Sequence, residues 1–168
     1  MKIETKRLIL REYTEEDFPA LHKIVSDPVT MSYWAEPFTE EKTGLWMNWS
    51  KDGHSKHGFG RCAIILKDNN ELIGDAGFFF TKVNEKPEND LGWIIDKKYW
   101  NRGFGTEAAS ACRDYAFNSL GLPRMVANMA FDNHSSRRVA EKIGMTKEAE
   151  FYNKKNRDIL TFLFVIEL

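Results

Sequence analysis

The chain has 168 residues, of which 42% are hydrophobic and 29% are charged. This length suits one domain, expected to span residues 1–168, and the apolar content can bury one core, which excludes a disordered chain. The net charge of −1 excludes a general attraction to nucleic acid or to an anionic membrane. No apolar run approaches the roughly 18 residues of a membrane-spanning helix.

The cysteines and histidines lack the spacing of a metal site or a disulfide. Cys62 and Cys112 lie far apart, and no histidine pair at ligand spacing accompanies a carboxylate. We therefore expect no metal. Residues 1–18 lack the apolar stretch and cleavage site of a secretion signal, so the expected compartment is the cytoplasm, where thiols stay reduced.

The first half of the chain predicts a strand, two helices and three strands. Thr5–Tyr13 is the first expected strand, and a capping box at Thr14 begins a helix that ends at Asp27-Pro28. A second helix begins near Thr39, and Gly53 and Gly58 are expected to bracket the loop after it. Three further strands are expected at 59–66, 72–83 and 90–96, with a polar connection at 82–89 before the last.

The second half alternates helices and strands. After Gly103 the apolar residues recur at helical spacing until Gly121 and Pro123. The remaining expected elements are a strand at 124–131, a helix at 135–143 and two strands near 145–152 and 159–166. This order predicts an α/β or α+β fold, in which helices pack against a sheet.

The segment 90–109, DLGWIIDKKYWNRGFGTEAA, joins an apolar strand to an alanine-rich helix through a basic turn. A helix start leaves backbone N–H groups unpaired and carries the positive end of the dipole. Gly103 and Gly105 lack side chains that would keep an anion away, so the turn suits a phosphate or pyrophosphate. The turn alone is equally typical of a tightly packed helix start. It is not a Walker A loop, and because Ala108 replaces a third glycine, a dinucleotide site stays only an alternative.

Three segments in this order resemble the GCN5-related N-acetyltransferases (GNAT), and within them the RimJ/RimL-type ribosomal-protein N-acetyltransferases. They are ETKRLILR at 4–11, YWNRGFGTEA at 99–108 and NHSSRRVAEKIGM at 133–145. The likeness covers almost the whole chain. It implies a mixed, mostly antiparallel sheet with a splayed parallel strand pair, flanked by helices.

The resemblance also implies acetyl-CoA as co-substrate, bound where the two parallel strands splay. The backbone of Trp93, Ile94 and Ile95 would pair with the acetyl and pantetheine arm. The pyrophosphate would be held by the backbone of Arg102, Gly103, Phe104, Gly105 and Thr106. Asn133 would bond the pantetheine arm or cap the helix at Ser135, and the two roles can coexist.

The implied reaction is direct acetyl transfer to a primary amine in a ternary complex. An alkyl amine with a pKa near 10 is mostly protonated at neutral pH, so a general base is needed. Asp90, at the position of a glutamate in many relatives, is the expected base, and an exposed aspartate at a strand start is the alternative. Glu88 and Asp75 are back-ups, although a carboxylate at Asp75 requires a partner if it is buried.

The expected acid is Ser136, because Ala140 occupies the position of the tyrosine that many relatives use. A first-turn helix hydroxyl is the alternative interpretation of Ser136, and Tyr152 is a distant second candidate for the acid. The apolar helix face of Cys112 argues against an acetyl-cysteine intermediate.

Trp34 and Trp46 lie where relatives form the acceptor wall, although aromatics at helical spacing are more often core. The acceptor stays open between a protein N-terminus and a small-molecule amine. The alternatives are a polyamine or aminoglycoside-like antibiotic as acceptor, or a non-catalytic acyl-CoA sensor. Many relatives form edge-to-edge dimers, so a homodimer also stays open.

Overall fold

The computed structural model describes residues 1–168 and contains one sheet with strand order β1-β2-β3-β4-β5-β6-β8-β7. The strands are β1 Lys2–Glu4, β2 Leu8–Arg11, β3 Arg61–Leu66, β4 Glu71–Val83, β5 Lys86–Ile95, β6 Arg124–Ala130, β7 Thr146–Asn153 and β8 Ile159–Glu167. The helices are α1 Phe18–Val25, α2 Glu40–His57, α3 Phe104–Asn118 and α4 His134–Lys142, with short 3-10 turns at Glu15–Asp17 and Lys97–Tyr99. None of the helices has the length and apolar character needed to cross a bilayer.

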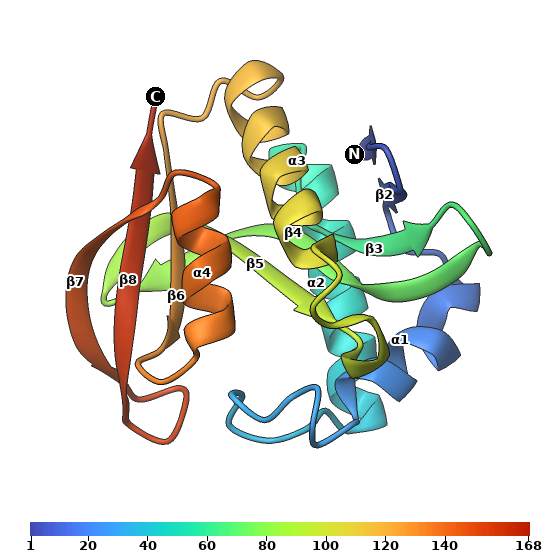
Figure 1. The fold of residues 1–168 in the computed structure, drawn as a ribbon, viewed down its shortest axis with the longest axis horizontal. Coiled ribbons are helices and arrows are strands. Elements are labelled where there is room, and N and C mark those ends of the chain that lie inside the picture. Colours follow the sequence, from blue (N-terminus) through green and yellow to red (C-terminus); the bar gives the residue numbers. More distant parts are fainter.

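One strand pair differs from all the others. β5 and β6 run parallel and share the single register pair Asp90 and Val126, whereas every other pair is antiparallel. Beyond that pair the strands diverge, as Figure 1 shows where β5 runs away from β6. The expected fold class, a mixed and mostly antiparallel sheet with a splayed parallel pair, is confirmed.

Helices cover both faces of the sheet, and each face has its own core (Figure 1). α3 packs on one face through small side chains, which let the helix lie close to the strands; these are Ala108, Ala109, Cys112 and Ala116. α1 and α2 cover the other face through Leu21, Ile24, Val25, Trp46 and Met47. A site located where β5 and β6 diverge would therefore be supported by one core on each face of the sheet.

Two boundaries near the N-terminus differ from the sequence prediction. Of the strand expected over Thr5–Tyr13, only β2 is a strand; Thr5 and Arg7 lie in the turn that joins β2 to the preceding β1, where both bond Glu107. α2 does not stop at Gly53 but runs to His57, and Gly58, with φ of 79°, ends it. Gly53 lies inside this helix, where the chain packs closely: a Cβ at this position would lie only 2.7 Å from the Phe59 carbonyl oxygen, so glycine is required.

The polar connection expected at 82–89 is wrong. β4 and β5 continue through it as a long hairpin, and only Asn84 and Glu85 form the turn, with φ of 47° and 66°. Consecutive left-handed residues are the geometry of the tightest hairpin turns. Pro87 is opposite Lys82 in this ladder, so the polar composition reflects an exposed hairpin rather than a loop.

Candidate active site at the splayed strands

A cleft of about 590 Å³ opens where β5 and β6 diverge. Four segments line it: the end of β5, the turn into α3, the first turns of α4, and the loop between α1 and α2. Most of the predicted cofactor residues lie on its wall, namely Trp93, Ile94, Ile95, Gly103, Phe104, Gly105, Thr106 and Asn133. Arg102 is the exception; it is exposed, and its guanidinium lies 5.4 Å from the centre of the Tyr99 ring.

The turn before α3 and the start of that helix place two glycines, Gly103 and Gly105, on the cleft wall. Asn101 and Gly103 have left-handed φ of 60° and 79°, and no side chain caps the helix that begins at Phe104. The first N–H groups of an α-helix have no intrahelical partner, so they remain available to an anion. A Cβ on Gly105 would lie 3.7 Å from Ile95 and 3.8 Å from Trp93, among side chains of the cleft wall.

A clamp from the N-terminal hairpin holds this turn in place. Glu107 accepts hydrogen bonds from Arg7 Nε at 2.7 Å, from Arg7 N at 2.9 Å and from Thr5 Oγ1 at 2.6 Å. Arg7 Nη1 also donates to the Arg102 carbonyl at 2.9 Å, and its guanidinium lies 4.2 Å from the centre of the Phe104 ring. The sequence analysis missed this contact, because Arg7 and Glu107 lie 100 residues apart and neither position indicates the other.

The strand edge next to the turn is open. Beyond Asp90, the edge of β5 that faces β6 has no strand partner. Trp100, which also lines the cleft, donates from Nε1 to the Ile95 carbonyl at 2.7 Å and thereby covers the end of β5. An extended ligand has room to pair along the free edge as an added strand would.

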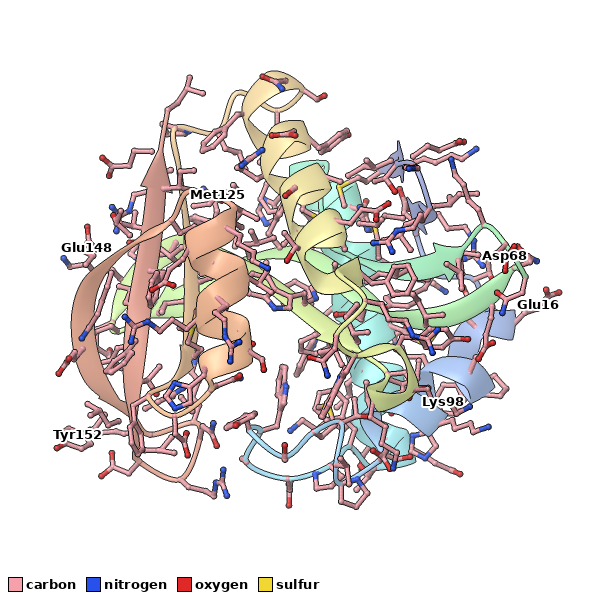
Figure 2. The ribbon with its side chains drawn as sticks, in the orientation of Figure 1. Glu16, Asp68, Lys98, Met125, Glu148 and Tyr152 are labelled. Carbon is pink, nitrogen blue, oxygen red and sulfur yellow. The ribbon has the colours of Figure 1, made fainter.

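The opposite wall is the start of α4. Asn133 caps the helix, accepting a hydrogen bond from Ser136 N at 3.1 Å, so its expected capping role is confirmed. Asn133 and the predicted acid Ser136 both line the cleft, whereas Ala140 is fully buried in the core. Tyr152, on β7, is 68% exposed and lies at the outer edge of the molecule (Figure 2).

Asp90 lies at the point where the parallel strands part. It is partly exposed and lies in mid-strand, not at the strand start that the alternative interpretation assumed. Asn128 of β6 donates to its Oδ1 at 3.0 Å. Burial raises the pKa of Asp90 to about 6, although the Arg61 charge and the Asn128 hydrogen bond act to lower it. A carboxyl group with this pKa is ionised at neutral pH and still accepts a proton readily.

The two back-up carboxylates are already paired. Glu88 is buried and bonds Arg124, with 3.1 Å between Arg124 Nε and Glu88 Oε2. Asp75 is fully buried and accepts hydrogen bonds from Arg61 Nε at 2.6 Å, from Trp46 Nε1 at 3.1 Å and from the Tyr13 hydroxyl. The expectation that a buried carboxylate at this position has partners is confirmed.

The two predicted acceptor-wall tryptophans have different surroundings. Trp34 lines the cleft, but Trp46 is only 8% exposed and packs behind it, with 5.7 Å between the ring centres. The loop that carries Trp34 is fixed at its neighbour Tyr33, whose carbonyl accepts a hydrogen bond from Asn156 Nδ2 at 2.8 Å. Trp46 thus supports the wall from within the core.

Comparison with known proteins identifies the family. Residues 7–146 match the family described as "Acetyltransferase (GNAT) domain". The chain is 35% identical over 152 residues to the Bacillus subtilis protein named "Uncharacterized N-acetyltransferase YnaD", covering 90% of this chain and 86% of that one.

Solved structures of acetyltransferases also match the whole chain. A GNAT-family acetyltransferase from Bacillus anthracis is 31% identical with a TM-score of 0.83, covering 99% of this chain and 98% of that one. An acetyltransferase from Agrobacterium tumefaciens is 28% identical with a TM-score of 0.87, covering 100% and 95%. The splayed parallel strands, the glycine turn beside them and these matches show that the chain is an N-acetyltransferase of the GNAT family.

Proposed function

We propose that this enzyme transfers the acetyl group of acetyl-CoA directly to a primary amine, with Asp90 as the general base. The observation that carries the proposal is the position of Asp90: a partly exposed carboxyl with a pKa of about 6, at the pair where the strands part and three residues before Trp93, where β5 begins to line the cleft. An amine whose own pKa is near 10 must lose a proton before it attacks, and Asp90 accepts that proton.

The cleft fits acetyl-CoA, which supplies a thioester when bound. The uncapped start of α3 and the left-handed Gly103 offer backbone N–H groups to the pyrophosphate. The edge of β5 at Trp93–Ile95, apart from the Ile95 carbonyl that Trp100 already bonds, offers backbone groups to the pantetheine arm, and Asn133 lines the cleft at the start of α4, where it can reach the same arm. A backbone N–H near Ile94 or Ile95 is the proposed donor to the carbonyl oxygen of the thioester.

Ser136 is the proposed acid for the leaving thiol. It lines the cleft on the wall opposite β5. A thiolate whose conjugate acid has a pKa near 8.5 leaves with little help, so a hydrogen bond from a hydroxyl is sufficient, and the proton that ends on the thiol comes from the attacking amine or from solvent. The fully buried Ala140 excludes a side-chain acid from that position.

For the acceptor, we propose a protein N-terminus or a small-molecule amine, bound beside Trp34 with Trp46 behind it. The three motifs support a place near the RimJ/RimL-type enzymes. The fold does not choose between acceptors, because the RimL ribosomal L7/L12 N-acetyltransferase and the spermidine N-acetyltransferase of Vibrio cholerae both share it at 20% identity. A polyamine or aminoglycoside-like acceptor and an edge-to-edge homodimer stay predictions. The buried free thiols of Cys62 and Cys112 suit the cytoplasm.

The test measures binding and transfer separately. Acetyl-CoA at about 100 times its dissociation constant should add about 2.7 kcal/mol of stability, or on the order of 5 to 10 °C in melting temperature. Asp90→Asn should bind acetyl-CoA unchanged and lose about 100-fold or more in transfer to an amine from a panel of peptides and polyamines. An Asp90→Asn enzyme as active as the wild type would overturn the base. Binding without transfer to any amine would favour the acyl-CoA sensor.

A further inference from the structure

A buried cation lies on the acceptor side of the sheet, and the proposed chemistry does not use it. Arg61 of β3 is 4% exposed, and its guanidinium donates to Asp75 from Nε at 2.6 Å and to the Gly77 carbonyl from Nη1 at 3.3 Å. Burial alone would lower the pKa of Arg61, but the facing Asp75 carboxylate raises it overall, so the guanidinium is charged. Burying such a pair is costly and rarely improves stability over an apolar pair.

The strand register places this cation beside Asp90. Arg61, Gly77 and Gly92 form one row across β3, β4 and β5. A Cβ on Gly92 would overlap Arg61 Nη1 and lie 3.1 Å from Arg61 Cζ, so the guanidinium extends over Gly92. Side chains two residues apart on a strand share a face and are about 7 Å apart. On that face, Asp75 lies in the neighbouring row on one side of Arg61, and Asp90 lies in the neighbouring row on the other side.

The other groups around Asp90 are few. Asn128 of β6 bonds it without carrying charge, and Glu88 of β5 is already paired with Arg124. Lys155, in the turn between β7 and β8, acts to lower the pKa of Asp90, but it is exposed and bonds the Lys82 carbonyl at 3.3 Å. Solvent and salt screen an exposed charge far more than a buried one. Arg61 is therefore the buried cation beside Asp90, and Asp75, its partner, lies one row farther along the same face.

We propose that the buried Arg61–Asp75 pair sets the protonation state of Asp90, which makes both residues positioning residues that act through the base without touching substrate. The inference rests on the proposed function only for its catalytic meaning. The contact with the Asp75 carboxylate offsets part of the charge of Arg61. Removing the Asp75 charge frees Arg61 to favour the Asp90 carboxylate, whereas removing the Arg61 charge leaves Asp75 to oppose it.

The experiment follows the Asp90 carboxyl directly by NMR titration of protein labelled with ¹³C-aspartate, the signal being assigned by its loss in Asp90→Asn. We expect Asp75→Asn to lower the pKa of Asp90 and Arg61→Gln to raise it, each by about one unit. The double variant Arg61→Gln/Asp75→Asn should return it to within about 0.3 unit of wild type. Arg61→Lys, which keeps the charge, should leave it near the wild-type value. The acid limb of kcat/KM should move with the carboxyl.

Both single variants break the same ion pair, so a purely structural role would not move the pKa in opposite directions. Shifts in the same direction, or no shift, would overturn the inference. If Arg61→Gln does not fold, Asp75→Asn and the double variant decide: a downward shift that the second substitution removes supports the proposal, and an unmoved pKa refutes it. If Asp90→Asn is inactive but the pKa of Asp90 does not move in the Arg61 and Asp75 variants, only this inference is overturned. If Asp90→Asn is fully active, only the role of Asp90 as the base is overturned.

Discussion

The two sides of the cleft use charge in opposite ways. On the proposed cofactor side, the partly exposed Arg7 and Glu107 brace a glycine turn that lines the cleft. On the acceptor side, Arg61 and Asp75 are buried on β3 and β4, on the same face of the sheet as Asp90. The first side depends on backbone shape and the second on side-chain charge. Substitutions should therefore separate them: acceptor-side changes should affect stability and pH dependence, and cofactor-side changes should affect affinity for acetyl-CoA.

The largest effect is expected at Asp75. Asp75→Ala leaves the Arg61 guanidinium buried without its partner, which should lower the free energy of unfolding by about 3 to 5 kcal/mol in urea denaturation. The matched control is Asp52→Ala, which removes the exposed pair of Lys56 and Asp52, 3.5 Å apart. That variant should change stability by about 0.5 kcal/mol or less. Equal losses in the two variants would show that burial does not distinguish the acceptor side.

Asp90→Asn should stabilise the protein, and only above acidic pH. Because the folded pKa of Asp90 is about 6 and its usual value is 3.8, the folded state holds this proton more tightly than the unfolded chain. The wild type therefore loses stability as pH rises from about 4 to about 6, by about 2 kcal/mol once partial exposure is allowed for. Asparagine has no such ionisation. The stability difference between variant and wild type should grow over that window in urea titrations, and a difference independent of pH would contradict the raised pKa.

On the cofactor side, Gly105→Ala should weaken binding without harming the fold. The added methyl would have ordinary contacts of 3.7 Å or more within the protein, and alanine favours a helix. It would, however, project among the cleft-wall residues, so calorimetry should show about tenfold weaker binding of CoA at an unchanged or higher melting temperature. Gly44→Ala in α2, with its nearest contact at 4.0 Å, is the control and should leave binding unchanged. Unchanged affinity in Gly105→Ala would mean that the ligand does not approach this turn.

The difference between the two sides also explains what the sequence could predict. The cofactor turn lies in one contiguous segment, where Gly103, Gly105 and a following helix suffice to indicate an anion site. The acceptor-side network joins Tyr13, Arg61 and Asp75, which come from separate segments and meet only through strand register. Asp75 indicated that a partner was needed, but no local pattern named Arg61. Likewise the polar residues at 82–89 predicted a loop, because exposed hairpin strands and loops have similar composition.

The clamp offers a smaller, kinetic test of the cofactor side. Arg7→Gln and Glu107→Gln each remove charge-assisted bonds that hold the turn, so the KM for acetyl-CoA should rise by about three- to tenfold while kcat stays near wild type. Lys2→Gln, in the exposed pair with Glu4 at 3.3 Å on the same hairpin, is the control and should change neither. A fall in kcat at constant KM would place the clamp in the chemical step instead.

The smallest effect is expected at Cys112, the one cysteine on α3, the helix that begins at the glycine turn. Its thiol is fully buried against the sheet, and burial raises its pKa to about 12, so almost no thiolate exists at neutral pH. An acetyl-cysteine route would require that thiolate. Cys112→Ala should therefore keep the transfer rate within about twofold, and initial-rate plots against both substrates should intersect, as a ternary complex requires. Parallel lines together with loss of transfer in Cys112→Ala would establish a covalent intermediate and assign side-chain chemistry to a side that otherwise works through its backbone.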